Sequence, residues 1–178
     1  MTMPATSSPK SLSEEAERVY QEGDFEGAAR LYGEAASAFQ ALGHLIDAAE
    51  MKNNQSVAHL QAGDAQAALD AVSGTAQVFA AAADLRRQGI ALANEATPLQ
   101  TLGKHDQAIE KYREAAAIFT QAGEDQLGAA VMQAVAGIHL RHGRVLEAFG
   151  ALRAGLADVK KPTFTQKIMK GLLRFRLW

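Results

Sequence analysis

The sequence predicts an all-helical (all-α) solenoid made of about four antiparallel helical hairpins, followed by a C-terminal amphipathic helix. Four glycines stand 40 residues apart, and an alanine follows each of them five residues later. A phenylalanine recurs with the same period. A period of about 20–50 residues is typical of stacked repeats, in which each unit buries its apolar face on its neighbours. The repeated residues are Gly23, Gly63, Gly103 and Gly143, then Ala28, Ala68, Ala108 and Ala148, and Phe39, Phe79 and Phe119.

Each glycine of the repeat separates the two helices of one hairpin. Glycine suits the left-handed conformation that ends a helix, and an aspartate such as Asp24 or Asp64 can cap the next helix. The second helices end at the equivalent positions Gly43, Ala83 and Gly123. Helices are therefore expected near residues 13–22, 25–42, 46–62, 65–82, 85–102, 105–122, 125–142 and 145–158.

Three segments of different character divide the chain. Residues 1–12 are rich in Ser, Thr and Pro, and we expect them to be disordered. The four-repeat solenoid is expected to occupy residues 13–160, and residues 161–178 should form the basic amphipathic C-terminal helix. Pro98 lies inside the helix expected at 85–102 and predicts a kink before its last turn.

Composition excludes several classes of protein. A net charge of −2 gives no general footprint for nucleic acid, and the lack of cysteine excludes disulfides and a thiol nucleophile. No apolar run approaches the roughly 18 residues of a transmembrane helix, and the N-terminus lacks the apolar core of a signal peptide, so a cytoplasmic protein is expected. Charge is uneven, because no acidic residue follows Asp158 whereas six Lys and Arg residues do.

The four repeats resemble the tetratricopeptide repeat. That family places a small residue in the first helix, glycine at the turn, alanine five residues on and another small residue twelve on. The third repeat has Ala96, Gly103, Ala108 and Ala115 at these positions. The others have Ala16, Gly23, Ala28 and Ala35; Ser56, Gly63, Ala68 and Thr75; and Ala136, Gly143, Ala148 and Gly155. The family tryptophan is missing, and the period is 40 rather than 34, as in the long-helix subclass found in several bacterial and polarity-scaffold proteins.

The resemblance implies a right-handed superhelix whose first helices line a concave groove, and it implies binding of a peptide or helix of another protein, or oligomerisation. Amides on this face could bond a peptide backbone. The alternative is that Asn54 and Asn94 only bond neighbouring helices and hold the repeat geometry. The clamp with which some relatives hold chaperone tails is not expected, because only Asn54 fits it. The expected groove residues are Asn53, Asn54, Val57, Leu60, Gln61, Asn94, Gln100, Gln133 and Arg141.

No pattern of catalytic residues is present. The sequence lacks the nucleophile-elbow, phosphate-loop and dinucleotide motifs, and its acidic residues are typical of solvated helix faces. His139 and His142 share a helical face, but no cysteine or paired aspartate supports a metal site. We therefore expect no enzyme activity, no cofactor and no metal.

The C-terminal segment combines apolar and basic residues on one expected helix. Its apolar stripe is Phe164, Ile168, Leu172 and Phe175. Three readings stay open: the helix caps the last hairpin, it contacts a partner or a second copy of the chain, or it lies on a membrane surface. We expect this stripe to pack on protein, because the rest of the chain is acidic. The function predicted overall is a non-catalytic scaffold or adaptor for protein–protein interaction; the alternatives are a self-assembling module and a peripheral membrane adaptor.

Overall fold

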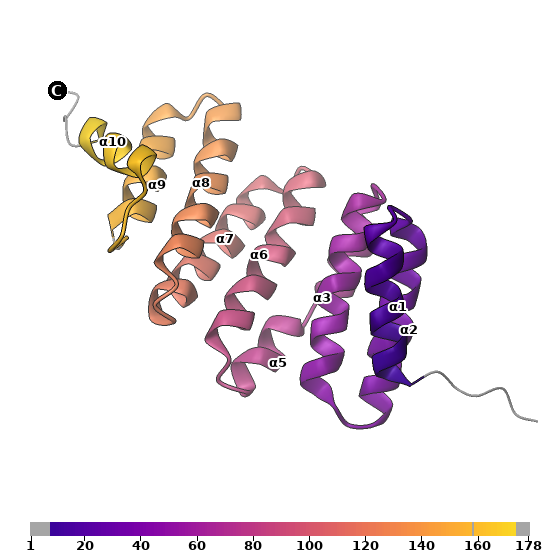
Figure 1. Ribbon diagram of the computed structural model, residues 1–178. Coiled ribbons are helices and arrows are strands. Elements are labelled where there is room, and N and C mark those ends of the chain that lie inside the picture. The colour runs from indigo at the N-terminus through magenta and orange to yellow at the C-terminus, as the bar shows by residue number, and fades with distance from the viewer. Residues whose placement is uncertain (1–7, 158, 174–178) are drawn as a thin grey trace, which may run out of the picture.

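The computed structural model describes residues 8–157 and 159–173, and this part of the chain is helical throughout, apart from turns and short connections. The helices follow one another in antiparallel pairs, from α1 at one end of an elongated row to α10 at the other (Figure 1). Their bounds are α1 (Pro9–Gln21), α2 (Phe25–Ala41), α3 (Leu45–Gln61), α4 (Ala65–Val72), α5 (Thr75–Ala81), α6 (Leu85–Thr101), α7 (His105–Gln121), α8 (Asp125–Arg141), α9 (Val145–Ala157) and α10 (Phe164–Leu172). The predicted all-helical solenoid is confirmed.

The turns between paired helices repeat one geometry. Gly23, Gly63, Gly103 and Gly143 all have positive φ, between 70° and 87°. After the first of them, the Asp24 carboxylate accepts the backbone N–H of Gly27 at 2.8 Å and so caps α2. Glycine is required at these positions because other residues adopt the left-handed conformation only with strain.

Small residues lie buried where the paired helices cross. Ala28, Ala68, Ala108 and Ala148 have 0–1% of their surface exposed, as predicted from their spacing. Their counterparts in the first helices, such as Ala96, are buried as well. A core of apolar side chains then runs continuously from Ala49 to Ala151, and a separate cluster fills the first pair. Close approach at the alanine crossings therefore sets how tightly the two helices of a pair pack.

The second helix of the second pair is divided in two. A single helix was expected over residues 65–82, but α4 ends at Val72 and α5 begins at Thr75. Between them Ser73 has an extended ψ of 129° and Gly74 has a φ of 80°. The prediction of a single helix is wrong here. It rested on the 40-residue spacing, which does not take into account a glycine in the left-handed conformation within the span.

The first helix begins earlier than predicted. Ser8 caps α1 by accepting the backbone N–H of Ser11 at 3.1 Å, and Pro9 occupies the first turn. Proline suits that position because its missing N–H would have no partner there. Residues 9–12 were expected to be disordered and are helical instead; residues 1–7 lie outside the described residues. Farther along, α6 runs through the buried Pro98 and ends one turn later.

The C-terminal helix α10 packs on the fourth pair, but not through the predicted stripe. Met169 and Leu173 pack against a cluster of Ala129, Leu156 and Val159. By contrast, Phe164 is 79% exposed and Ile168 is 50% exposed. The side chain of Leu172 and all of Phe175 lie outside the described residues. The reading in which Phe164 and Ile168 pack on the last hairpin of the same chain is therefore wrong, because another face of the helix makes that contact. Packing of this stripe on another protein surface stays a prediction.

Candidate protein-binding surfaces

The first helices α3, α6 and α8 present one row of side chains at equivalent repeat positions. Apart from Asn53, the predicted residues of this row are partly or fully exposed, whereas crossing residues of the same helices, such as Ser56 and Ala96, are buried. Of the predicted groove residues, the partly exposed ones are Asn54, Val57, Leu60, Asn94 and Gln100, and the exposed ones are Gln61, Gln133 and Arg141. Amides and small apolar groups dominate this face, so it can offer hydrogen bonds to a main chain together with apolar contact.

Two of the predicted amides bond within the protein. Asn53 is only 6% exposed, and its Nδ2 donates to the carbonyl of Ala49 at 3.0 Å. The Nδ2 of Asn94 donates to Asn53 Oδ1 at 3.2 Å and links α6 to α3. Asn53 is therefore committed to the fold rather than to a ligand, and Asn94 has one hydrogen bond committed to the stacking of neighbouring repeats.

An ion pair joins the first helices α3 and α6 at one end of this row. The Arg87 guanidinium lies 3.0 Å from Glu50 on α3 and 2.6 Å from Asp84 at the start of α6. It also lies over the Phe79 ring, 5.5 Å from the centroid. The backbone N–H and the guanidinium of Arg87 hold the pKa of the Asp84 carboxyl below its usual value. Because the partners are partly exposed, these pairs fix side-chain positions more than they stabilise the fold.

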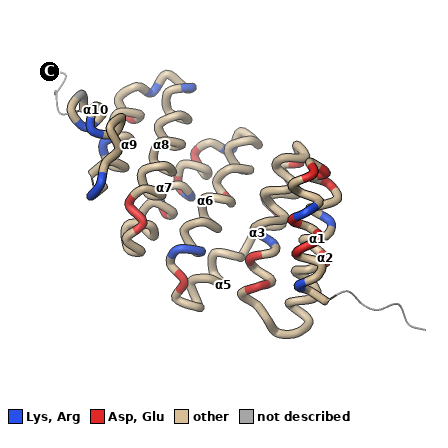
Figure 2. Tube along the Cα trace, viewed as in Figure 1, with Lys and Arg blue, Asp and Glu red and all other residues tan. Residues whose placement is uncertain are grey.

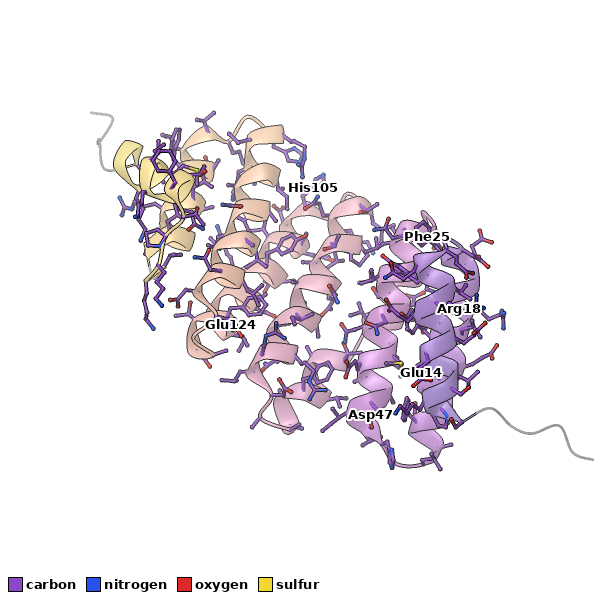
Figure 3. The ribbon with its side chains drawn as sticks, viewed as in Figure 1. Glu14, Arg18, Phe25, Asp47, His105 and Glu124 are labelled. Atoms are coloured by element: carbon purple, nitrogen blue, oxygen red, sulfur yellow. The ribbon has the colours of Figure 1, made fainter. Side chains whose placement is uncertain are left out.

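A cleft between α3 and α5 was not predicted from the sequence. A cavity of about 780 Å³ is lined by the α2–α3 turn, the start of α3 and α5, and a second of about 240 Å³ adjoins it and reaches Ser73 and Gly74. Leu45 is 57% exposed and Ile46 is 38% exposed at the rim. Asp47 marks this edge of the molecule in Figure 3. The signal that could have located the cleft is the Ser73–Gly74 pair, where the helix is divided.

A group of buried polar atoms lies between α7, α8 and the α8–α9 turn. Both ring nitrogens of His139, Nδ1 of His105 and Nε of Arg144 have no hydrogen-bond partner among the described residues. The rings of His105 and His142 lie 4.5 Å apart. Burial, followed by the positive charge of Arg144, holds the pKa of His139 below its usual value. Within the described part of the chain no three His, Cys, Asp or Glu side chains come together as metal ligands would.

The junction of α10 with the fourth pair is polar at its rim. Thr163 and Gln166 form a reciprocal cap at the start of α10. Gln166 Nε2 donates to Gln126 Oε1 at 2.9 Å, and Lys170 Nζ donates to the Val159 carbonyl at 3.1 Å. These bonds hold the helix with its Met169 side inward and so leave the Phe164 face outward. None of the helices in the described ranges has the length and apolar character needed to cross a membrane.

Comparison with solved structures identifies the fold. One similar structure is a Podosopora anserina putative kinesin light chain protein with nearly identical TPR-like repeats. The match covers 96% of this chain and 87% of that protein, with a TM-score of 0.72 and 17% sequence identity. A variant of that protein matches with a TM-score of 0.73 and 17% identity, over 97% of this chain and 84% of the variant. BtubC from P. vanneervenii matches over 92% of this chain and 70% of its own, with a TM-score of 0.68 and 19% identity. No family model and no curated protein matches the sequence.

Proposed function

Starting from a TPR-like helical-repeat fold, we propose that this chain is a non-catalytic scaffold that binds a peptide or helix of another protein along α3, α6 and α8. Proteins of this architecture generally mediate protein–protein interaction. The observation that carries the proposal is the set of partly or fully exposed amides and apolar residues on the corresponding face of three successive first helices.

The amides in this row support the proposal because several are uncommitted. Asn54, Gln100 and Gln133 come from three different helices, and none donates a side-chain hydrogen bond to another described residue. An extended peptide exposes backbone N–H and C=O groups that such amides can satisfy. Val57 and Leu60 lie on the same helix as Asn54 and supply apolar contact.

A peptide selected against the immobilised full chain from a random library provides the ligand for a test. The double variant Gln100→Ala with Gln133→Ala should weaken binding of that peptide about tenfold, because each lost hydrogen bond contributes about 0.5–1.5 kcal/mol. Fluorescence anisotropy of the labelled peptide measures the change, and circular dichroism checks that helicity is retained.

The matched control is Gln107→Ala with Gln121→Ala, which removes two exposed amides from the second helix α7. This control should bind the peptide like the parent. Equal affinity of the parent and both double variants would contradict binding along the first helices. Asn94→Ala is a poor probe by itself, because losing its bond to Asn53 changes the repeat contact as well.

The α3–α5 cleft is the competing location for the same function. Its exposed Leu45 and Ile46 could receive one apolar anchor of a partner. Leu45→Asp should leave the fold intact, since the side chain is mostly exposed. If Leu45→Asp no longer binds the selected peptide and the double variant of Gln100 and Gln133 binds it fully, the peptide site is the cleft rather than the face of the first helices.

A further inference from the structure

The outward face of α10 is apolar and uncovered. Phe164 and Ile168 are four residues apart, so they lie side by side on the helix, and both are at least half exposed. The other apolar face of the helix, with Met169 and Leu173, packs on the fourth pair. Two exposed large side chains next to each other at the end of the solenoid indicate a surface that is covered by something else.

The surroundings of this face are basic. Lys160, Lys161 and Lys167 are exposed, and Lys170 lies at the rim of the junction. No acidic residue occurs after Asp158 in the sequence. Figure 2 shows Lys and Arg gathered on α10 and the segment before it, whereas Asp and Glu are spread over the preceding helices. The partner of this face therefore combines negative charge with an apolar layer.

Among the described residues, a second copy of the chain offers that combination mainly at the α2–α3 turn, around Asp47. Three acidic side chains of the first pair already bridge to basic neighbours: Glu15 and Glu22 to Arg18, and Glu34 to Arg30. The exposed apolar residues at the α2–α3 turn are Leu42, Leu45 and Ile46, with Asp47 beside them. Those of α8 and α9 lie close in sequence to the basic residues Arg141 and Arg144; they are Leu140, Val145, Leu146 and Phe149. A bilayer with anionic headgroups presents both features together, with negative charge directly above hydrocarbon.

We infer that α10 is a docking surface for an anionic lipid membrane, with Phe164 and Ile168 entering the interface and the lysines contacting the headgroups. The position of α10 at the end of the row opposite α1 lets the solenoid extend away from the bilayer (Figure 1). The face formed by α3, α6 and α8 then stays accessible. The inference rests on the burial and charge of α10 and is independent of the proposed peptide site.

Vesicle co-sedimentation of the full chain tests the inference. Vesicles of phosphatidylglycerol and phosphatidylcholine in equal parts should bind the protein, and vesicles of phosphatidylcholine alone should bind it much more weakly. Phe164→Ser with Ile168→Ser should lower binding to the anionic vesicles more than about tenfold. Replacing Lys160, Lys161 and Lys167 by glutamine should lower it about fivefold for each lysine, and added salt should lower it further.

Leu146→Ser is the matched control, because Leu146 is 77% exposed on α9 and its loss removes a similar apolar group from a neighbouring helix. This variant should bind like the parent. No binding to anionic vesicles at low salt, or equal binding by the Phe164 and Ile168 variant, would overturn the inference. Light scattering without lipid tests the alternative that this face contacts a second copy. If the parent forms an oligomer that the double variant of Phe164 and Ile168 does not form, and no vesicle binding is seen, the face serves self-association.

Discussion

The second and third hairpins have equivalent first helices but different second helices. α3 and α6 each contain 17 residues, and both end at a left-handed glycine turn. In the third hairpin α7 then continues unbroken for 17 residues. In the second hairpin the same span is divided into α4, with 8 residues, and α5, with 7. The difference is therefore confined to the middle of one second helix.

Local chemistry accounts for the division. In the third hairpin the Tyr112 hydroxyl lies 3.1 Å from Thr97 Oγ1 and ties α7 to α6, whereas the second hairpin has Val72 at the Tyr112 position. Thr75 replaces the alanine of the crossing, and its hydroxyl donates to the Val72 carbonyl at 2.8 Å. Gly74 supplies the positive φ between them. The repeat thus tolerates a divided second helix, because the first helices and the alanine crossings maintain the stack.

The largest effect is expected from overpacking the unbroken hairpin. Ala108 has no exposed surface, so Ala108→Leu should lower the free energy of unfolding by about 1–3 kcal/mol. Ala68→Leu, at the same position in the divided hairpin, should cost less because the short α4 can shift. Urea unfolding measures both. Ala117→Leu is the matched control on the exposed side of α7, and equal stability of the Ala108 and Ala117 variants would mean that the repeat alignment is wrong.

Gly74→Ala probes the division itself. An alanine held at a φ of 80° should lower the free energy of unfolding by about 1–2 kcal/mol. Gly150→Ala is the contrasting variant: Gly150 lies within α9, and nothing lies within 4 Å of an added Cβ, so alanine should raise stability by up to about 1 kcal/mol. If the free energy of unfolding changes in the same direction in both variants, residue 74 is not held in the left-handed conformation.

Ala83→Gly should stabilise the end of the divided hairpin. Ala83 has a φ of 56°, and the equivalent Gly43 and Gly123 have 77° and 74°. Relief of the left-handed strain should raise the free energy of unfolding by up to about 1 kcal/mol, after the entropy cost of glycine is subtracted. Thermal melting measures the gain. Ala82→Gly, one residue earlier and with a φ of −86°, should lose stability instead; a gain there would remove the conformational explanation.

The smallest expected effect is on pH dependence and extends the comparison to the fourth hairpin. The same repeat position carries partly exposed His59 in the second hairpin and His139, only 4% exposed, in the fourth. Burial and the charges of Arg144 and Arg113 lower the pKa of His139 from 6.5, against the opposing effect of nearby Glu147 and Asp106. The unfolded chain therefore binds this proton more readily than the folded one, and stability should fall as pH drops below about 6.5.

Urea unfolding above and below that pH measures this dependence. His139→Leu removes the titrating group while keeping an apolar side chain in its place. The variant should lose less stability than the parent on acidification. An identical pH dependence in both proteins would show that His139 does not contribute to it.

The binding face was only partly predictable from the sequence. The repeat spacing placed Asn53 and Asn54 on the first helix of the second hairpin, α3. Neighbouring residues of a helix point about 100° apart, and as a result Asn53 is buried while Asn54 stays partly exposed. The cleft between α3 and α5 could not be inferred from the period. It arises because two residues, Ser73 and Gly74, redirect a helix whose other positions match the repeat.

The 40-residue spacing alone predicted the fold class, the number of hairpins and their crossing residues. Spacing is enough for these, because glycine turns and alanine contacts are local requirements that recur every 40 residues. Which face of α10 is covered, by contrast, depends on how the helix packs against the fourth hairpin. Phe164 and Met169 belong to one helix with apolar residues on two sides, and the surface of the fourth hairpin selects Met169. Burial depends on neighbours far away in sequence, so periodicity within one helix cannot specify it.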